Sequence, residues 1–514
     1  MIQTEIKILA MYLPQYHKVK ENDEWWGEGY TDWISTKRAV PLFEGHNEPR
    51  IPQDNNYYDL MSKETMIWQA DLMHQYDIDG MCIYHYWFKN GRQILEKPAE
   101  NLLRWKEINM PYCFCWANET WARSWANISG ANSWYDNEKT ELKDGKAVLL
   151  EQQYGNYGDW KKHFEYLLPF FKDKRYLRLD DKPIFLFYKP EEIICLTQML
   201  IYWEELAKEH GLKGIYTIGA NLNNGIKDGL DAELYHQPGH TVHFLQMQKV
   251  EGVNTLDYDK MWKYILSEQT ISPNVIFGGF VDYDDTPRKG KEGVSIVGAD
   301  PLKFQKYLTE LISKNIKNGN GLLFINAWNE WGEGMYLEPD QKNRDAFLKA
   351  VKKAKRDAKI CPETIKFEYS VEIDKIKSVY SEKNKIDSYF HTLDKWLTIK
   401  EKGKCLGQYF QENGVKSVGI YGYGILGKHL VEELYDSDIT IKCIIDKKVV
   451  NAEHNINIIK PEEQIPDLDM IVVTAYYFWN EIIELIGKKD SYQIVSLETI
   501  VNWMLDHEND SFIS

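Results

Sequence analysis

Apolar runs of strand length recur along the first two thirds of the chain and alternate with amphipathic stretches of helical period. The runs leave no polar face, which is typical of strands buried on both sides of a parallel sheet. We therefore predict parallel strands connected by helices. The strand-like runs are residues 6–13, 79–88, 110–118, 183–188, 214–220, 275–281 and 321–328, and the clearest helical stretches are 64–76 and 301–317.

Seven or eight such units in about 350 residues favour an α/β fold, a TIM-like (β/α)8 barrel with long loops. A doubly wound open sheet is the alternative. Polar and aromatic residues gather directly after several strands, as at 12–17, 84–87, 116–119 and 328–330. Because barrel enzymes carry their chemistry at the carboxyl ends of the strands, this pattern predicts a functional face there.

The pattern changes after residue 359. Residues 360–413 are charged and helical in period, and we expect a helical connector there. A new strand begins near Lys416 and further strand-like runs follow, which predicts a small Rossmann-like α/β domain over residues 414–514. The expected organisation is a barrel domain at residues 1–359, the connector and this C-terminal domain.

Composition narrows the function. The 514 residues carry a formal net charge of -16, which argues against a nucleic-acid partner because phosphate contacts need a basic face. The chain has no apolar run of about 18 residues and no signal-like N-terminus, so we expect no membrane insertion and a cytoplasmic location. The cysteines lack metal-type spacing, and we expect buried thiols. They lie at positions 82, 113, 115, 195, 361, 405 and 443.

Glu330 and Glu333 follow the last predicted barrel strand, three residues apart and flanked by tryptophans and glycines. Glycosidic chemistry needs one carboxylic acid at the leaving oxygen and a second carboxylate as base or nucleophile. Two close carboxyl groups walled by Trp would have separated pKa values, which keeps one protonated near neutral pH. A solvated acidic loop is the alternative. A metal site is not expected, because no histidine lies at ligand spacing.

Aromatic and polar residues near the strand ends are candidate sugar contacts, in a chain with 18 Trp and 33 Tyr. The alternatives are structural: a loop plug for residues 25–33, a salt bridge from Glu119 to Arg123, a wall position for His85, and capping turns around Asp285. His236 and Gln237 are weaker candidates. The candidate substrate-binding residues are Tyr12, Gln15, His17, Trp26, Asp32, Trp33, His85, Tyr86, Trp87, Trp116, Asn118, Glu119, Asp285, Arg288, Trp328, Asn329 and Trp331.

The residues at 84–87 would alternate between the barrel interior and the helix layer if their strand continues.

Several blocks along roughly residues 6–355 carry a resemblance to a known family. They are AMYLPQYH (10–17), DEWWGEGYTDW (23–33), PLFEGHNEPRIPQD (41–54), GMCIYHYWF (80–88), FCWANETWARSW (114–125), DKPIFLFYKP (181–190), DYDDTPR (282–288) and AWNEWGEGMYLEP (327–339).

In that order the blocks resemble the glycoside hydrolase family 99-like domain of WbsX-type proteins, which occur in bacterial surface-polysaccharide gene clusters. The resemblance implies retaining cleavage of α-mannoside-like bonds. It implies that Glu330 acts as base at the sugar 2-hydroxyl in a neighbouring-group mechanism, and that Glu333 is the general acid/base at the leaving oxygen. WbsX-type proteins have often been labelled glycosyltransferases.

Gly422, Gly424 and Gly427 follow a predicted strand and open a helix, and Asp446 ends the next strand 19 residues after Gly427. This order is typical of a dinucleotide-binding loop and predicts a nucleotide or nucleotide-sugar ligand. A vestigial or partner-docking module is the alternative. Glycosidic chemistry itself requires no cofactor.

Three functions from different classes remain. The first is an enzyme acting on α-glycosidic bonds of an oligosaccharide or polysaccharide in surface polysaccharide metabolism, such as lipopolysaccharide O-antigen or capsule. The second is a nucleotide-sugar-dependent glycosyltransferase, and the third is a non-catalytic carbohydrate-binding scaffold. The paired glutamates favour the first over the third. The sequence predicts no oligomeric state.

Overall fold

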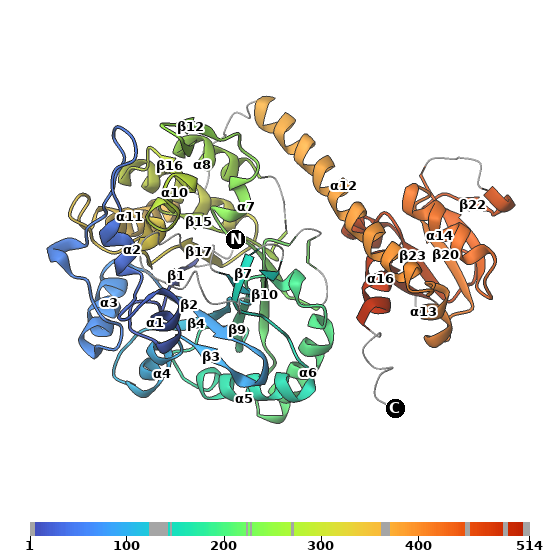
Figure 1. The fold of residues 1–514 in the computed structure, drawn as a ribbon, viewed down its shortest axis with the longest axis horizontal. Coiled ribbons are helices and arrows are strands. Elements are labelled where there is room, and N and C mark those ends of the chain that lie inside the picture. The colour runs from blue at the N-terminus through green and yellow to red at the C-terminus, as the bar shows by residue number, and fades with distance from the viewer. Residues whose placement is uncertain are drawn as a thin grey trace. The chain divides into compact units, whose positions relative to one another are not determined.

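The computed structural model describes residues 6–122, 142–143, 146–222, 225–226, 229–268, 272–360, 371–447, 453–486 and 492–506. The chain divides into two compact units (Figure 1). The first comprises residues 1–222 and 226–373, and the second comprises residues 223–225 and 374–514.

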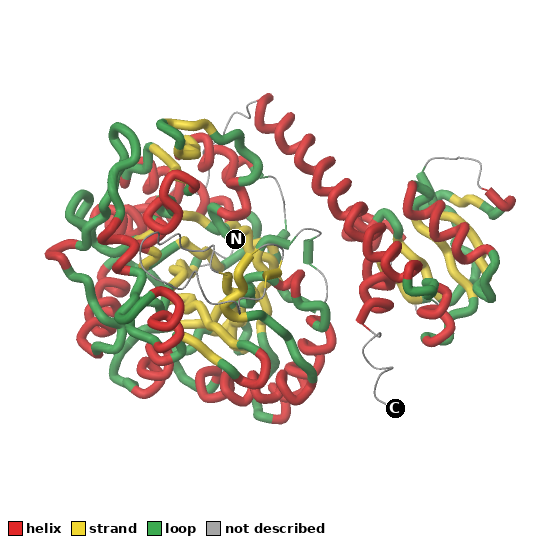
Figure 2. Tube along the Cα trace, in the orientation of Figure 1, coloured by secondary structure: helices red, strands yellow, loops and turns green. Residues whose placement is uncertain are grey.

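The first unit is built on a parallel sheet that curls into a nearly closed barrel, in the order β14-β11-β10-β9-β4-β2-β1-β17-β15. Figure 2 shows these strands inside a surround of helices. The predicted TIM-like barrel is therefore confirmed. The strands are β1 (Lys7–Tyr12), β2 (Gly80–Trp87), β4 (Tyr112–Trp116), β9 (Lys182–Phe187), β10 (Tyr216–Ala220), β11 (Ala232–Tyr235), β14 (Val275–Phe277), β15 (Gly279–Phe280) and β17 (Leu322–Asn326).

Gly278 divides the predicted strand 275–281 into β14 and β15 and so allows the ring to close. On one side β14 pairs with β11, and on the other β15 pairs with β17. A Cβ at position 278 would lie 2.5 Å from the carbonyl oxygen of Tyr235, a contact that only glycine avoids. Because one segment supplies both strands, the nine strands correspond to eight barrel positions.

The strand β11 escaped the sequence pattern because it is short and contains Glu233. This side chain is nonetheless buried, and one oxygen accepts a hydrogen bond of 3.1 Å from the Leu222 amide. Burial raises the pKa of Glu233 to about 8. The charged side chain of Glu233 therefore kept this core strand from being predicted from the hydrophobic pattern.

Helices cover the barrel with their apolar faces inward. In α10 (Pro301–Lys317), Asp300 caps the N-terminus by accepting from the amides of Leu302 and Lys303, and Pro301 occupies the first turn. The spacing of Phe304, Leu308 and Leu311 then places all three in the core. The other main covering helices are α3 (Lys63–Gln75), α4 (Lys97–Arg104), α5 (Tyr157–Phe171), α6 (Leu196–Glu209), α8 (Tyr258–Ser267) and α11 (Ala346–Ile360).

The second unit contains a five-stranded parallel sheet in the order β22-β21-β20-β23-β24. Numbered by sequence this is 3-2-1-4-5, the order of a Rossmann-like sheet, so that prediction is confirmed. Its elements are β20 (Ser417–Tyr421), α14 (Ile425–Tyr435), β21 (Thr440–Ile445), β22 (Ile458–Ile459), β23 (Met470–Val473), α15 (Trp479–Ile486), β24 (Gln493–Ser496) and α16 (Leu497–Asp506).

Two helices occupy most of the predicted connector, α12 (Val371–Glu401) and α13 (Gly407–Glu412). Trp396, Ile399 and Phe410 are buried in the hydrophobic core of the second unit. The end of the connector therefore packs as part of that unit.

None of the helices in the described ranges is both long and apolar enough to cross a bilayer. The six cysteines that the structure describes are all free. Cys82, Cys113, Cys115 and Cys443 are buried as expected, whereas Cys195 is half-buried and Cys405 is exposed; Cys361 lies outside the described residues.

Candidate active site

The two glutamates lie on a tight hairpin just after β17, at the carboxyl end of the barrel. The hairpin consists of β18 (Asn329–Glu330), a 3-10 turn (Trp331–Glu333) and β19 (Met335–Tyr336), with Glu330 paired to Met335. Gly334 closes the turn with φ +61, a left-handed conformation that favours glycine. The hairpin therefore brings both carboxyl groups to the same end of the barrel.

Asn329 fixes this hairpin to the end of β1. Its Oδ1 accepts from the Leu13 amide at 2.8 Å, and its Nδ2 donates to the Leu13 carbonyl at 3.0 Å. The Tyr16 hydroxyl donates to the Asn329 carbonyl at 2.7 Å and accepts from the Trp331 amide at 3.0 Å. Glu330 thus stands between two residues whose backbone is held by the neighbouring strand end.

Glu338 supports the hairpin from below. It accepts hydrogen bonds from Trp331 Nε1 at 2.7 Å, from the Tyr58 hydroxyl at 2.9 Å and from Gln69 Nε2 at 2.8 Å. Burial raises the pKa of Glu338 to about 7, and these donors oppose the rise. Such a buried carboxyl group positions Trp331, the residue next to Glu330.

Arg50 holds the other side of the turn. Its Nη1 donates to the Gly334 carbonyl at 3.1 Å and to Asp282 Oδ2 at 2.7 Å. The Asp284 amide donates to the Glu333 carbonyl at 2.7 Å. The backbone around Glu333 is therefore tied to the segment that follows β15.

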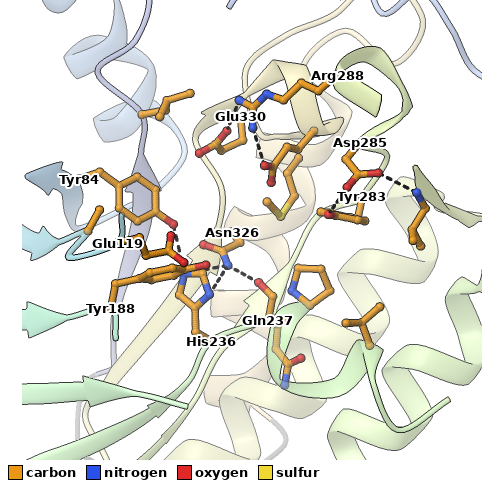
Figure 3. A pocket seen from close by; sticks show the side chains of 18 of the residues that line it. Tyr84, Glu119, Tyr188, His236, Gln237, Tyr283, Asp285, Arg288, Asn326 and Glu330 are labelled. Carbon is orange, nitrogen blue, oxygen red and sulfur yellow. Dashed lines mark hydrogen bonds and ion pairs between the residues drawn. The ribbon is translucent and has the colours of Figure 1, made fainter. Parts of the chain in front are cut away.

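Arg288 joins the two glutamates. Its Nη1 lies 2.5 Å from Glu333 Oε1 and its Nη2 lies 3.2 Å from Glu330 Oε2. The opposite edge of the guanidinium binds Asp32, with Nη2–Oδ2 at 2.7 Å and Nε–Oδ1 at 3.2 Å. Figure 3 shows Arg288 reaching over Glu330. One cation thus serves three carboxylates that come from two distant parts of the chain, Asp32 and the hairpin that carries both glutamates.

This arrangement shifts the acidity of both glutamates. Burial, the nearby Glu333 and Asp32 raise the pKa of Glu330 to about 8, against the opposing effect of Arg288. Burial also raises the pKa of Glu333, again opposed by Arg288. Two coupled carboxyl groups with raised pKa values hold a proton near neutral pH, which supplies the acid of an acid–base pair.

Both glutamates open into a cavity of about 450 Å³, a size suited to a small ligand or a few sugar rings. Tyr84, Tyr188 and His236 stand on the side of the cavity away from Arg288 (Figure 3). The Tyr84 hydroxyl lies 3.2 Å from His236 Nε2, and the Tyr188 and His236 rings meet edge to face at 5.2 Å. Burial lowers the pKa of His236 to about 4, so this ring is neutral at pH 7.

The cavity gathers some of the predicted site residues and leaves out others. Those that line it are Gln15, Tyr86, Glu119, Asp285, Arg288, Glu330 and Glu333. Those that do not line it are Tyr12, His17, Trp26, Asp32, Trp33, His85, Trp87, Trp116, Asn118, Trp328, Asn329 and Trp331. Of the second group, Asp32, Asn329 and Trp331 act on the site through the contacts described above.

Strand β2 separates its residues as the alternation predicts. Tyr84 and Tyr86 line the cavity, whereas His85 and Trp87 face the helix layer. There His85 Nε2 lies 2.9 Å from His163 Nε2 of α5, and Trp87 stacks on the same histidine at 4.5 Å. His85 is therefore a hydrogen-bonded residue on the outer side of the barrel wall and does not line the cavity.

Two acidic lining residues are already paired with lysines. Glu119 lies 3.6 Å from Lys189, while Arg123, its partner in the structural alternative, lies outside the described residues. Asp285 Oδ2 lies 2.6 Å from Lys289 Nζ and accepts a hydrogen bond from the Tyr283 hydroxyl at 3.0 Å. Both carboxylates remain at the cavity wall.

The family relationship follows from comparison of this barrel with known proteins. Residues 8–351, from β1 into α11, match the family described as glycosyltransferase WbsX. The match covers more than half of the chain. The chain belongs to the WbsX family. Its Rossmann-like sheet lies outside the matched range.

Two curated relatives, both called WxcX, come from two strains of Xanthomonas campestris pv. campestris. Each is 31% identical over 363 residues, which cover 68% of this chain and 49% of the relative. The WbsX-family chain thus spans about half the length of the curated relatives it matches.

Solved structures also resemble it. The GH99 endo-alpha-mannosidase from Bacteroides thetaiotaomicron, in complex with Bis-Tris-propane, is 12% identical with a TM-score of 0.41, and covers 68% of this chain and 97% of its own. A glycoside hydrolase-like protein is 10% identical with a TM-score of 0.41, and covers 69% and 95%.

Sequence reasoning missed several residues that line the WbsX-family cavity, among them Tyr188, Tyr283 and Asn326. Tyr188 and Asn326 lie at the carboxyl ends of β9 and β17, so the rule that placed the other candidates would have found them. His236 and Gln237, judged weaker, also line the cavity. The unpredicted strand β11 ends directly before them.

In the second unit, Gly422 and Gly424 lie in the turn between β20 and α14, and Gly427 lies in the first turn of α14. A Cβ on Gly427 would lie 2.1 Å from the Gly422 carbonyl, whereas nothing lies within 4 Å of a Cβ on Gly424. This leaves room for a phosphate beside Gly424. The predicted ribose ligand Asp446 instead accepts from the Tyr423 amide of the same turn at 2.7 Å. The turn fits a nucleotide at Gly424 and fits it poorly at Asp446.

Proposed function

We propose that this WbsX-family chain breaks α-glycosidic bonds of a mannoside-like glycan with retention and passes the sugar to water or to another hydroxyl. The supporting observation is the pair of glutamates joined by Arg288 inside the cavity at the carboxyl end of the barrel. Surface polysaccharide metabolism is the setting that the resemblance of the sequence implies.

In this proposal Glu330 takes the proton of the sugar 2-hydroxyl, whose oxygen attacks the anomeric carbon as the glycosidic bond breaks. Glu333 gives its proton to the leaving oxygen. Glu333 then takes a proton from the incoming hydroxyl, whose oxygen attacks the anomeric carbon and opens the strained ring. Glu330 returns its proton to the sugar O2, which regenerates the 2-hydroxyl and restores the original configuration. Two displacements at the anomeric carbon give retention, as in other two-step glycosidases.

The pKa values set a condition on this scheme. In the free site the pKa of Glu330, about 8, favours the proton on Glu330. A sugar 2-hydroxyl that donates to Glu330 stabilises the charged carboxylate and lowers its pKa, while the leaving oxygen requires a donor at Glu333. We therefore propose that substrate binding moves the shared proton toward Glu333, whose side chain is the more exposed of the two at 28%.

Aryl α-mannosides with leaving groups of different acidity test these roles. Glu333→Gln should lose about 10²–10⁴ in kcat on a poor leaving group and little on a good one, which needs no protonation. Glu330→Gln should slow both substrates alike. Absence of cleavage by the wild-type chain on every α-mannoside would reject the proposal.

A nucleotide-sugar-dependent glycosyltransferase is the second candidate. It is supported by the family description and by the open space beside Gly424 in the Rossmann-like unit. In this case GDP-mannose should bind the full chain, and Gly424→Ala should weaken that binding because the added methyl fills the space. Equal affinity of the wild type and the variant for GDP-mannose would show that the nucleotide does not bind beside Gly424.

A further inference from the structure

The wall of the barrel cavity is acidic. Among the described residues, four carboxyl groups and two side chains that are always cationic at neutral pH line it. The carboxyl groups belong to Glu119, Asp285, Glu330 and Glu333, and the cations are Arg288 and Lys289. A further cation, Lys189, lies 3.6 Å from the carboxylate of Glu119.

Both lining cations already form ion pairs with carboxylates of the protein. Lys289 Nζ lies 2.6 Å from Asp285 Oδ2. Arg288 contacts Glu330 and Glu333, and its remaining edge is occupied by the buried Asp32. A phosphate or carboxylate on a ligand would have to displace one of these partners, which leaves a desolvated carboxylate unpaired.

The carboxyl groups already repel one another across the cavity. Besides burial, Glu333 and Asp32 raise the pKa of Glu330, and Asp285 and Asp32 raise that of Glu333. Burial first, and then Glu333 among other carboxylates, raises the pKa of Glu119. A ligand anion would add to this repulsion.

The opposite wall offers uncharged surface. Tyr84 and Tyr188 present rings and hydroxyls, and His236 is neutral at pH 7 because burial lowers its pKa to about 4. Such surfaces suit the C–H faces and hydroxyls of neutral sugars. A bound divalent cation is the usual means of holding a diphosphate in an acidic site. Across the described part of the chain no cluster of three His, Cys, Asp or Glu side chains is placed to bind one.

We propose that the barrel cavity takes an uncharged glycan as sugar donor and excludes sugars that carry a carboxylate, a phosphate or a nucleoside diphosphate. This deepens, and rests on, the proposed action on α-glycosidic bonds. A transfer by this cavity then breaks one glycosidic C1–O bond and forms another, and the proton of the accepting hydroxyl ends on the leaving oxygen. No sugar nucleotide enters the barrel.

Calorimetric titration of the full chain tests the donor class without turnover, in the isosteric Glu333→Gln background. The probes are methyl α-mannobioside, the same disaccharide oxidised at C6 of one ring to the uronate, and GDP-mannose with and without Mn²⁺. The mannobioside should bind, and the uronate should bind at least about tenfold more weakly. Added salt should narrow that gap, because screening weakens repulsion of the anion alone. GDP-mannose should not displace the mannobioside under either condition.

Glu119→Gln in the same background removes the carboxylate that lies 3.6 Å from Lys189. It should improve the affinity for the uronate relative to that for the mannobioside about 3- to 10-fold, because only the uronate carries a charge that Glu119 repels. The matched control is Glu165→Gln, which removes a glutamate 3.9 Å from Lys161 on the outer face of α5 and should change neither affinity. Equal binding of uronate and mannobioside, displacement by GDP-mannose, or no mannobioside binding at millimolar concentration would each overturn the inference. Cleavage by the wild-type chain is scored separately, so mannobioside binding without cleavage counts against the proposed function alone.

Discussion

Arg288 and Asp32 form a two-point ion pair, with distances of 2.7 and 3.2 Å, although 256 residues separate them along the chain. Asp32 is buried and precedes α2 (Trp33–Arg38), and Arg288 lies on the short helix α9 (Thr286–Lys289). Because Arg288 also contacts Glu330 and Glu333, the pair determines where the positive charge sits between the two glutamates. This dependence makes Asp32 a positioning residue.

Asp32→Asn should lower kcat by at least about tenfold, because the side chain that orients Arg288 loses its charge. It should also shift the pH–rate limb that belongs to the glutamate pair to lower pH, since Asp32 raises the pKa of Glu330. The pH dependence of kcat/KM measures this shift. Asp71→Asn, an exposed change on α3, is the control, and an unmoved limb in Asp32→Asn would exclude the electrostatic role.

The stability of the barrel should fall between pH 4.5 and 8 through Glu330. Its pKa is about 8 in the folded chain against an ordinary value of 4.5, so over this range the unfolded chain releases a proton that the folded chain keeps. The stabilisation is complete below pH 4.5 and lost by pH 8. Glu330→Gln, which cannot ionise, should therefore gain on the order of 1–3 kcal/mol relative to wild type between pH 5 and pH 8. Urea unfolding at both pH values tests it; a constant difference contradicts the assigned pKa.

Gly334→Ala should destabilise the chain by about 1–3 kcal/mol and reduce kcat. The residue has φ +61, and its added Cβ would lie 2.7 Å from Arg50 Cζ, which would push the turn that carries Glu333. Gly211→Ala is the matched control, with φ +80 and nothing within 4 Å of the Cβ. Equal losses in both variants would mean that backbone strain alone matters and that Arg50 does not position the turn.

Glu338→Gln should cost about 1–3 kcal/mol of folding free energy, because an amide NH2 would face at least one of the three donors that Glu338 now accepts. In one amide orientation the NH2 faces Gln69 Nε2. In the other it faces both Trp331 Nε1 and the Tyr58 hydroxyl, which donate to the same oxygen of Glu338, so both lose their acceptor. Chemical denaturation measures the loss. The exposed change Glu209→Gln should show none.

Gly427→Ala should unfold the second unit at lower denaturant, although alanine usually stabilises a helix. The added Cβ would lie 2.1 Å from the Gly422 carbonyl, and the turn could not close. Gly424→Ala should leave stability unchanged because its Cβ meets nothing within 4 Å. Hydrogen exchange within residues 417–445 reports on this unit separately from the barrel. Faster exchange in Gly424→Ala than in Gly427→Ala would contradict the prediction.

Part of the candidate site could be predicted from local sequence pattern. Gln15 and Tyr86 were placed correctly at the cavity because strand ends and strand alternation are local properties of the chain. The same reasoning placed Trp328 and Trp116 at the site, yet both are buried away from the cavity. The signal of an aromatic residue after a strand is the same for a sugar platform and for core packing.

The sequence by itself determined the order of most strands and helices, the barrel class, the Rossmann-like unit and the position of Glu330 and Glu333 after the last barrel strand. Hydrophobic period, glycine turns and motif spacing act over a few residues, so they can be read along the chain. The tertiary structure alone decided that Asp32 and Arg288 meet, that His85 faces His163, and that β11 joins the barrel despite Glu233. These depend on ring closure, which brings together residues up to hundreds of positions apart and sets the charge around the glutamates, because Coulomb interactions depend on distance in space and not on separation along the chain.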